Sequence, residues 1–215
     1  MHVDIIIPTF DRLELLKQTV NSIQNGVYKD VSIFIVLDGN PALIKDITEM
    51  PAALIYNTKR KDWVFSMNRA LQYAQGDAVI YAADDLVFHK ACILTAVEKL
   101  KEAAPDGDAL VAITQDIKGC STAFGMMGRK FIDRFPGRAV ICPDYIHYGG
   151  DWELGQYARQ ANLFTLCPEA KVTHHRPKDA TYRKAKPVEA QDFWFIRERK
   201  AKGFLWGRDF GRVRK

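Results

Sequence analysis

Residues 78–85 read Ala78-Val79-Ile80-Tyr81-Ala82-Ala83-Asp84-Asp85, a short apolar run that ends in two adjacent carboxylates. Such a run is typical of a strand buried in a parallel sheet. Two charges at its carboxyl end are costly unless something compensates them. Because ligands of open α/β sheets bind outside the carboxyl ends of the strands, a divalent cation that carries a phosphorylated ligand is one interpretation. The other is a solvated loop, or an N-cap for a helix that begins near His89.

The sequence on both sides of this run alternates between strand and helix patterns. Apolar runs predict further strands at residues 3–7, 31–37, 53–56 and 109–114. Helical spacing of apolar residues predicts helices at residues 13–23, 64–74 and 91–100. This alternation predicts a mostly parallel sheet with helices on both faces. The later pattern is less regular, with short strands at 121–127, 139–142 and 170–173 and helices at 128–132 and 151–161.

Charge separates the end of the chain from the rest. Residues 1–175 carry 18 Lys and Arg against 21 Asp and Glu, whereas residues 176–215 carry 13 against 5. This basic segment also holds several aromatic residues, and we expect residues 193–204 to pack as a helix across the main domain. An anionic membrane surface or a nucleic acid is a possible partner for its cations.

Several protein classes are excluded by what the 215 residues lack. No run approaches the ~20 apolar residues of a membrane span, and the first apolar segment is too short for a signal peptide, so we expect a cytoplasmic protein. The four cysteines form no C-x-x-C pair that would suggest zinc or a dithiol site. The first strand is followed by Pro8-Thr9-Phe10-Asp11-Arg12 rather than by the glycines of a dinucleotide site or a P-loop.

In this order, the motifs resemble the nucleotide-binding half of family 2 glycosyltransferases of GT-A fold. The resemblance rests on short segments that follow one another along the chain. They are Ile5-Ile6-Ile7-Pro8-Thr9-Phe10-Asp11-Arg12, Ile35-Val36-Leu37-Asp38-Gly39, Asn68-Arg69-Ala70-Leu71 and Asp84-Asp85. It implies an α/β, Rossmann-like GT-A domain at residues 1–175, with a nucleotide-binding half at 1–103 and a small irregular acceptor half at 104–175. Residues 176–215 would form a basic helical extension.

The resemblance also implies a donor site for a nucleotide-diphosphate sugar. The residues it assigns to the nucleotide are Pro8, Thr9, Arg12, Asp38, Gly39, Asn68 and Asp84. Asp85 would bind Mn²⁺ or Mg²⁺, because neighbours in a strand face opposite sides and only one acid of the pair can reach the metal directly. His174 or His175 would complete the metal site. The family's glycine before the Asn68 helix is replaced here by Asp62-Trp63.

A late acidic motif, Gly149-Gly150-Asp151-Trp152-Glu153-Leu154, supplies the expected catalytic base. Asp151 is the first choice and Glu153 the second, because the acceptor hydroxyl must lose a proton. An N-cap for the helix that follows is the plain alternative for Asp151. The activity that the resemblance implies is metal-dependent transfer of a sugar, with inversion, to a glycan, a lipid-linked intermediate or a protein. A modified nucleic-acid base as acceptor, or a non-catalytic nucleotide-sugar-binding module, is the alternative.

Overall fold

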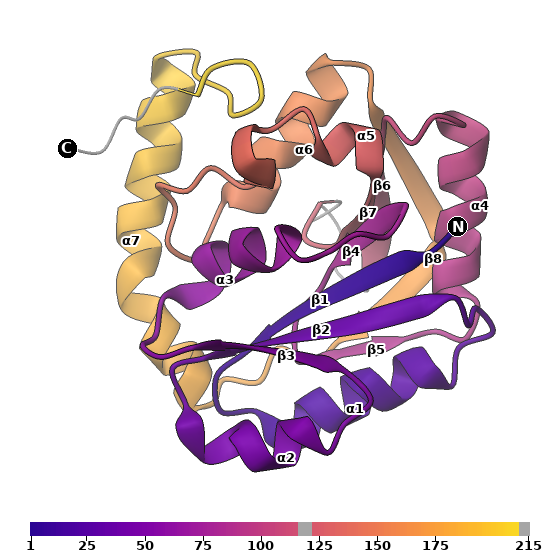
Figure 1. The fold of residues 1–215 in the computed structure, drawn as a ribbon. Coiled ribbons are helices and arrows are strands. Elements are labelled where there is room, and N and C mark those ends of the chain that lie inside the picture. Colours follow the sequence, from indigo (N-terminus) through magenta and orange to yellow (C-terminus); the bar gives the residue numbers. More distant parts are fainter. Residues whose placement is uncertain (116–121, 211–215) are drawn as a thin grey trace.

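The computed structural model describes residues 1–115 and 122–210, and in them a single eight-stranded sheet lies between two layers of helices (Figure 1). The sheet has the order β3-β2-β1-β4-β7-β6-β8-β5. Its strands are β1 (Val3–Thr9), β2 (Val31–Asp38), β3 (Ala53–Asn57), β4 (Ala78–Tyr81), β5 (Leu86–Phe88), β6 (Leu110–Gln115), β7 (Gly125–Gly128) and β8 (Phe164–His174).

The strands pair in a mixed pattern. β1, β2, β3 and β4 pair in parallel, and so do β6 and β8. β7 runs antiparallel to both β4 and β6, and β5 runs antiparallel to β8. The predicted α/β fold with helices on both faces is confirmed. β7 lies in the less regular later part of the chain, where the sequence offers no helix between β6 and β7 to carry a parallel crossover. β5 is a short strand that directly follows the acid pair, and the sequence does not predict it.

Each face of the sheet has its own apolar core. Alternate residues of β1 enter opposite cores, Ile5 and Ile7 on one side and Ile6 on the other. The first core is covered by α1 (Leu13–Gln24), α2 (Ile44–Thr48) and α4 (Cys92–Ala103). The second is covered by α3 (Asp62–Leu71), α5 (Arg129–Ile132), α6 (Gly150–Gln160) and α7 (Ala180–Ala201). Two short 3-10 turns, η1 (Pro41–Leu43) and η2 (Pro136–Arg138), complete the described elements.

The later half differs from prediction in two segments. Residues 139–142 form no strand; Ile141 is buried against α3, where its backbone pairs with the side chain of Asn68. β8 begins at Phe164, well before the predicted strand at 170–173, because its first residues pair with β6.

The basic segment forms the long helix α7, which runs along one side of the molecule (Figure 1). Phe195 and Arg199 of α7 are buried, whereas Phe193 and Trp194 are 46% and 59% exposed. No helix among the described residues is long and apolar enough to cross a bilayer.

Candidate active site

A pocket of about 520 Å³ opens at the carboxyl ends of β1, β2 and β4. Its volume lies in the range of small-molecule sites. The lining includes eight residues that the sequence predicts for the donor and catalytic sites: Pro8, Thr9, Arg12, Asp38, Asp84, Asp85, Asp151 and His174. Residues far apart in the sequence therefore converge because parallel strands end at one edge of the sheet.

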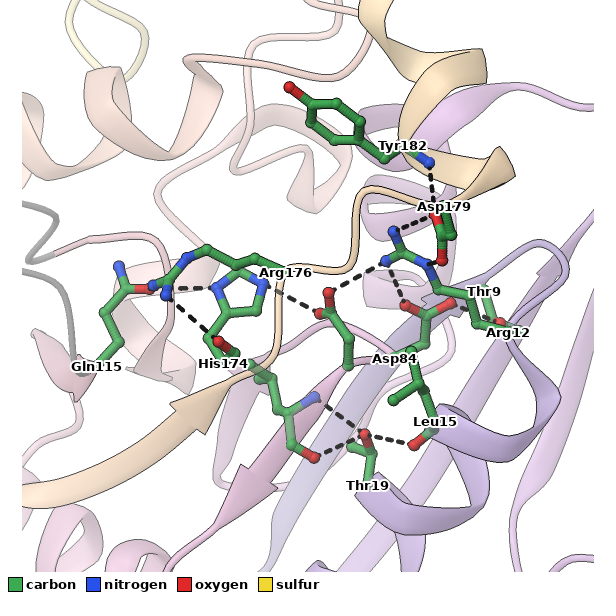
Figure 2. Close-up of polar contacts among 12 residues, drawn as sticks. Thr9, Arg12, Leu15, Thr19, Asp84, Gln115, His174, Arg176, Asp179 and Tyr182 are labelled. Carbon is green, nitrogen blue, oxygen red and sulfur yellow. Dashed lines mark hydrogen bonds and ion pairs between the residues drawn. The ribbon is translucent and has the colours of Figure 1, made fainter.

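The acid pair after β4 belongs to a dense polar network, in which Asp84 contacts both Thr9 and Arg12 (Figure 2). The hydroxyl of Thr9 donates to Oδ2 of Asp84 at 2.8 Å, and Nη1 of Arg12 lies 3.2 Å from Oδ1. The same Nη1 lies 3.2 Å from Oδ2 of Asp85. Burial raises the pKa of Asp84 to about 7, with a further rise from Asp85, while Arg12 and Thr9 oppose it. The protonation state of Asp84 therefore depends on its contact with Arg12.

Asp85 faces a different partner. Its Oδ1 lies 3.1 Å from Nε2 of His174, which the antiparallel pairing of β5 with β8 brings next to the acid pair. Burial opposes ionisation of Asp85, but His174 and Arg12 outweigh it and lower the pKa of the carboxyl. Nδ1 of His174 lies 3.3 Å from Oε1 of Gln115, which orients the ring. An ionised carboxylate and an oriented imidazole therefore stand side by side.

This pair fits a divalent cation in part. The described residues contain no group of three His, Cys, Asp or Glu side chains arranged to hold a metal. Oδ1 of Asp85 is nevertheless buried and faces Nε2 of His174 at 3.1 Å. One carboxylate oxygen and one imidazole nitrogen suit Mn²⁺, and the remaining positions would be taken by phosphate oxygens and water. His175 is exposed, and only its backbone N–H contacts Asp85, through the carbonyl oxygen.

Arg12 also ties the donor site to the start of α7. Its Nε and Nη2 donate to the two carboxylate oxygens of Asp179, at 2.8 and 3.1 Å (Figure 2). Asp179 in turn caps α7 by accepting the backbone N–H of Tyr182. Tyr182 and Thr181 line the pocket. The basic segment is therefore part of the pocket wall.

Asp38 holds a loop instead of leaving its carboxylate open to the pocket. It accepts the backbone N–H groups of Lys61 and Asp62 and one N–H of the Asn57 amide, at 2.8 to 3.1 Å. Gly39 follows with a φ of +79°, and a Cβ there would lie 2.3 Å from the backbone nitrogen of Arg60. These contacts press the 60–62 loop onto the end of β2. Gly39 does not line the pocket itself.

Two other predicted residues lie away from the pocket. The side chain of Asn68 donates to and accepts from the backbone of Ile141, at 2.7 and 3.1 Å, so it joins α3 to the 139–142 segment and not to a nucleotide. Glu153 is 2% exposed, and its carboxylate binds Arg199 of α7, the hydroxyl of Tyr145 and the backbone N–H of Trp206. Neither side chain lines this pocket, so nucleotide binding by Asn68 and base catalysis by Glu153 stay predictions.

Asp151 stands in the first turn of α6 and lines the pocket. Burial raises the pKa of its carboxyl, although backbone N–H groups of the turn oppose the rise. The helix begins after Gly149, whose φ is +84° and where a Cβ would lie 2.2 Å from a methyl carbon of Ile196. A carboxylate with a raised pKa is a stronger base, so Asp151 has the electrostatics of a proton acceptor.

The loop before Asp151 is held from α7 by Asp192. This carboxylate is fully buried and accepts the backbone N–H groups of three consecutive residues, Ile146, His147 and Tyr148, at 2.8 to 3.1 Å. His147 and Tyr148 line the pocket. No motif in the sequence points to Asp192, which stands between Gln191 and Phe193. Arg60, Asp62, Trp63 and Phe10 also line the pocket, and of these only the replacement of the family's glycine by Asp62-Trp63 was visible in the sequence.

Comparison with known proteins agrees with this architecture. Among solved structures, a mannosyltransferase from Pyrobaculum calidifontis, PcManGT, in complex with GDP-Man and Mn²⁺, superposes with a TM-score of 0.67 at 16% identity over 92% of this chain. TarS from S. aureus gives 0.66 at 12% identity over 87% of this chain, and its 1–349 fragment in complex with UDP-GlcNAc gives 0.64 at 14% over 83%. This chain covers 64%, 39% and 60% of those chains respectively, so the likeness concerns the fold alone.

The sequence itself settles the family. No curated protein matches it. The sequence profile described as glycosyl transferase family 2, however, matches residues 4–204, which is nearly the whole chain and includes the acid pair, the Asp151 turn and all of α7. The protein therefore belongs to glycosyl transferase family 2.

Proposed function

We propose that this protein transfers a sugar from a nucleotide-diphosphate sugar to an acceptor hydroxyl, with a divalent cation and with inversion at the anomeric carbon. The observation that supports the proposal best is the convergence of Arg12, Asp84, Asp85 and His174 at one end of the pocket that Asp151 also lines. The first four residues suit a diphosphate with its cation, whereas Asp151 suits removal of a proton.

The donor end of the pocket combines positive charge with a possible cation site. Asp85 and His174 would hold Mn²⁺ or Mg²⁺, which supplies charge neutralisation for the departing diphosphate when bound. Arg12 keeps its guanidinium at the same place through Asp84 and Asp179, and it can donate to a phosphate oxygen. Thr9 fixes the Asp84 carboxylate through its hydroxyl. These residues lower the energy of the charge that develops on the leaving group.

The acceptor end depends on Asp151. Its carboxylate takes the proton of the acceptor hydroxyl while that oxygen attacks the anomeric carbon from the face opposite the leaving diphosphate. The new carbon–oxygen bond forms as the bond to the diphosphate breaks, and the electron pair goes to the phosphate oxygen. This single displacement inverts the anomeric configuration. A base of this kind contributes about 100-fold or more to turnover.

The test is a screen of nucleotide-sugar hydrolysis and transfer, with and without Mn²⁺. We expect turnover that requires the cation, loss of cation-dependent nucleotide binding in Asp85→Ala, and an approximately 100-fold loss of turnover with donor binding kept in Asp151→Asn. Glu102→Gln is a suitable control, since this carboxylate is 70% exposed and pairs only with Lys99 on the surface. Donor binding without turnover in the wild type, and the same donor binding in Asp151→Asn, would instead support a non-catalytic sugar-nucleotide-binding module.

The acceptor class remains a prediction, as do the cytoplasmic location and the domain limit at residue 175. Glycan, lipid-linked and protein acceptors are distinguished by direct transfer assays with each class. Transfer to modified duplex DNA, with a steep dependence on salt, would instead identify a nucleic-acid base as the acceptor. Binding of α7 to an anionic membrane is a further prediction that vesicles of anionic lipid would test.

A further inference from the structure

The 60–62 loop contains a conformation that aspartate adopts only at a cost. Asp62 is the first residue of α3 and has a φ of +63°, in the left-handed region that favours glycine. Asp62 stands in the pocket wall together with Arg60. Residues held in such conformations cluster at functional sites, where the surrounding structure enforces them. Here Asp38 enforces it, because its carboxylate accepts the backbone N–H groups of both Lys61 and Asp62.

Asp38 is correspondingly a poor candidate for direct contact with a nucleobase. Both of its carboxylate oxygens already accept hydrogen bonds, Oδ1 from Asn57 and Lys61 and Oδ2 from Lys61 and Asp62. It is 5% exposed. Any base that lies in this part of the pocket therefore meets the loop that Asp38 holds before it meets Asp38.

The 60–62 loop presents a hydrogen-bond acceptor, the Asp62 carboxylate, beside a donor, the Arg60 guanidinium. Oδ1 of Asp62 accepts from Nε and Nη2 of Arg60, at 3.2 and 2.7 Å, and lies 3.6 Å from Nδ1 of His147. Among the described residues, nothing donates to Oδ2 of Asp62 and nothing accepts from Nη1 of Arg60. Burial opposes ionisation of Asp62, but His147 and Arg60 outweigh it and lower its pKa, so the carboxylate is charged at neutral pH.

A contact from outside the loop also fixes the position of Asp62 and Arg60. The Cζ atom of Arg60 lies 4.8 Å from the centroid of the Phe10 ring, so the guanidinium has an aromatic face beside it as well as the Asp62 carboxylate. The Asp62 and Arg60 side chains are 19% and 23% exposed. They are thus accessible from the pocket yet held on more than one side, as a pair that reads a ligand must be.

We propose that Asp62 and Arg60 together read the nucleobase of the donor, and that they select a base with a ring N–H at its pairing edge. Guanine and uracil or thymine carry such an N–H beside a carbonyl oxygen. The N–H would donate to Oδ2 of Asp62, and the carbonyl would accept from Arg60. Adenine and cytosine present an unprotonated ring nitrogen at the same position, and the carboxylate repels it. This inference rests on the proposed function, since it assumes that the pocket binds a nucleotide.

The test is isothermal titration of GDP, UDP, ADP and CDP, each with Mn²⁺, against the wild type, Asp62→Asn and Asp62→Gly. Asparagine and glycine are the residues that best tolerate a left-handed backbone, so both variants keep the loop conformation. We expect the wild type to bind GDP or UDP about 10- to 100-fold more tightly than ADP and CDP. We expect Asp62→Gly to lose this preference, and Asp62→Asn to lose or reverse it, because an amide N–H replaces the free oxygen. Glu102→Gln should keep it.

The outcomes separate this inference from the proposed function. A wild type that binds no nucleoside diphosphate overturns both. A wild type that binds GDP or UDP with Mn²⁺, and whose preference is unchanged in both Asp62 variants, overturns the role of Asp62 alone. Tightest binding of ADP or CDP by the wild type overturns the base selection and leaves the sugar-transfer proposal intact.

Discussion

Replacement of Glu153 by glutamine distinguishes a structural role from a catalytic one. The Glu153 and Arg199 side chains are 2% and 1% exposed. Nε of Arg199 lies 3.0 and 2.9 Å from the two oxygens of Glu153, and Nη2 lies 2.7 Å from Oε1. Tyr145 donates to the same carboxylate at 2.6 Å. Glutamine keeps the shape of the side chain but removes its charge and one acceptor, so the buried ion pair between Glu153 and Arg199 is lost.

The magnitude follows from the loss of that buried ion pair. Breaking a buried ion pair by removing one partner costs about 3–5 kcal/mol, whereas an exposed pair contributes about 0–1 kcal/mol. For a chain of this size we therefore expect Glu153→Gln to lower the melting temperature on the order of 10 °C. Glu14→Gln is the matched control, because Glu14 is 77% exposed and pairs with Lys17. It should shift the melting temperature by no more than a degree or two, on the order of the surface value.

The assay combines thermal unfolding, followed by circular dichroism, with turnover measured well below the transition. The double variant Glu153→Leu with Arg199→Met should recover much of the lost stability, because apolar residues of similar volume can replace a buried pair. We expect the folded fraction of Glu153→Gln to retain its turnover within a few fold. An unchanged melting temperature with a turnover loss of about 100-fold would refute this reasoning and return Glu153 to the role of base that the motif suggests.

Three further predictions concern the pocket. Asp192→Asn should lower kcat about 10- to 100-fold with little change in the donor KM, because it loosens the 146–148 loop next to Asp151; a parallel loss of donor binding would contradict this. The acidic limb of the kcat profile should lie above the range of an ordinary carboxylate, since Asp151 must be ionised to accept a proton and burial raises its pKa; a limb that persists in Asp151→Asn would assign it elsewhere. His174→Ala should weaken Mn²⁺-dependent nucleotide binding, whereas His175→Ala should not, and equal effects in titration calorimetry would count against the Asp85 and His174 pair.

The sequence predicts best where local periodicity and the order of motifs agree. The first four strands along the chain and helices α1 and α3 follow from apolar runs and helical spacing, and the acid pair falls at the carboxyl end of β4 as expected, whereas the short helix α2 is not predicted. The segment at 139–142 misleads because its apolar residues are buried beneath α3 as an irregular stretch, with Asn68 supplying partners for the backbone of Ile141. Periodicity reports burial, and it does not report whether a neighbouring strand exists.

Side-chain roles are harder to predict because similar carboxylates do different work. Asp84 and Asp85 are neighbours, yet burial raises the pKa of one while His174 and Arg12 lower that of the other. Asp151 and Glu153 are two residues apart in one helical turn, and only Asp151 lines the pocket. The partner that decides the role of Glu153 is Arg199, 46 residues later. No local motif contains that information.

The position of α7 explains how segments around the pocket are held in place. Three charged side chains of α7 and its N-cap join this helix to the rest: Asp179 binds Arg12, Asp192 binds the 146–148 loop, and Arg199 binds Glu153 in α6. Each contact lies on a segment that carries or adjoins a proposed catalytic residue. A helix that serves only as a soluble tail would not bury an aspartate and an arginine, because unpaired burial of either is costly. Apolar residues of α7 and these three polar contacts thus hold α6 and the 146–148 loop in position. A loss of catalytic geometry is therefore the expected result of disturbing α7, even though most of its surface lies far from the reacting atoms.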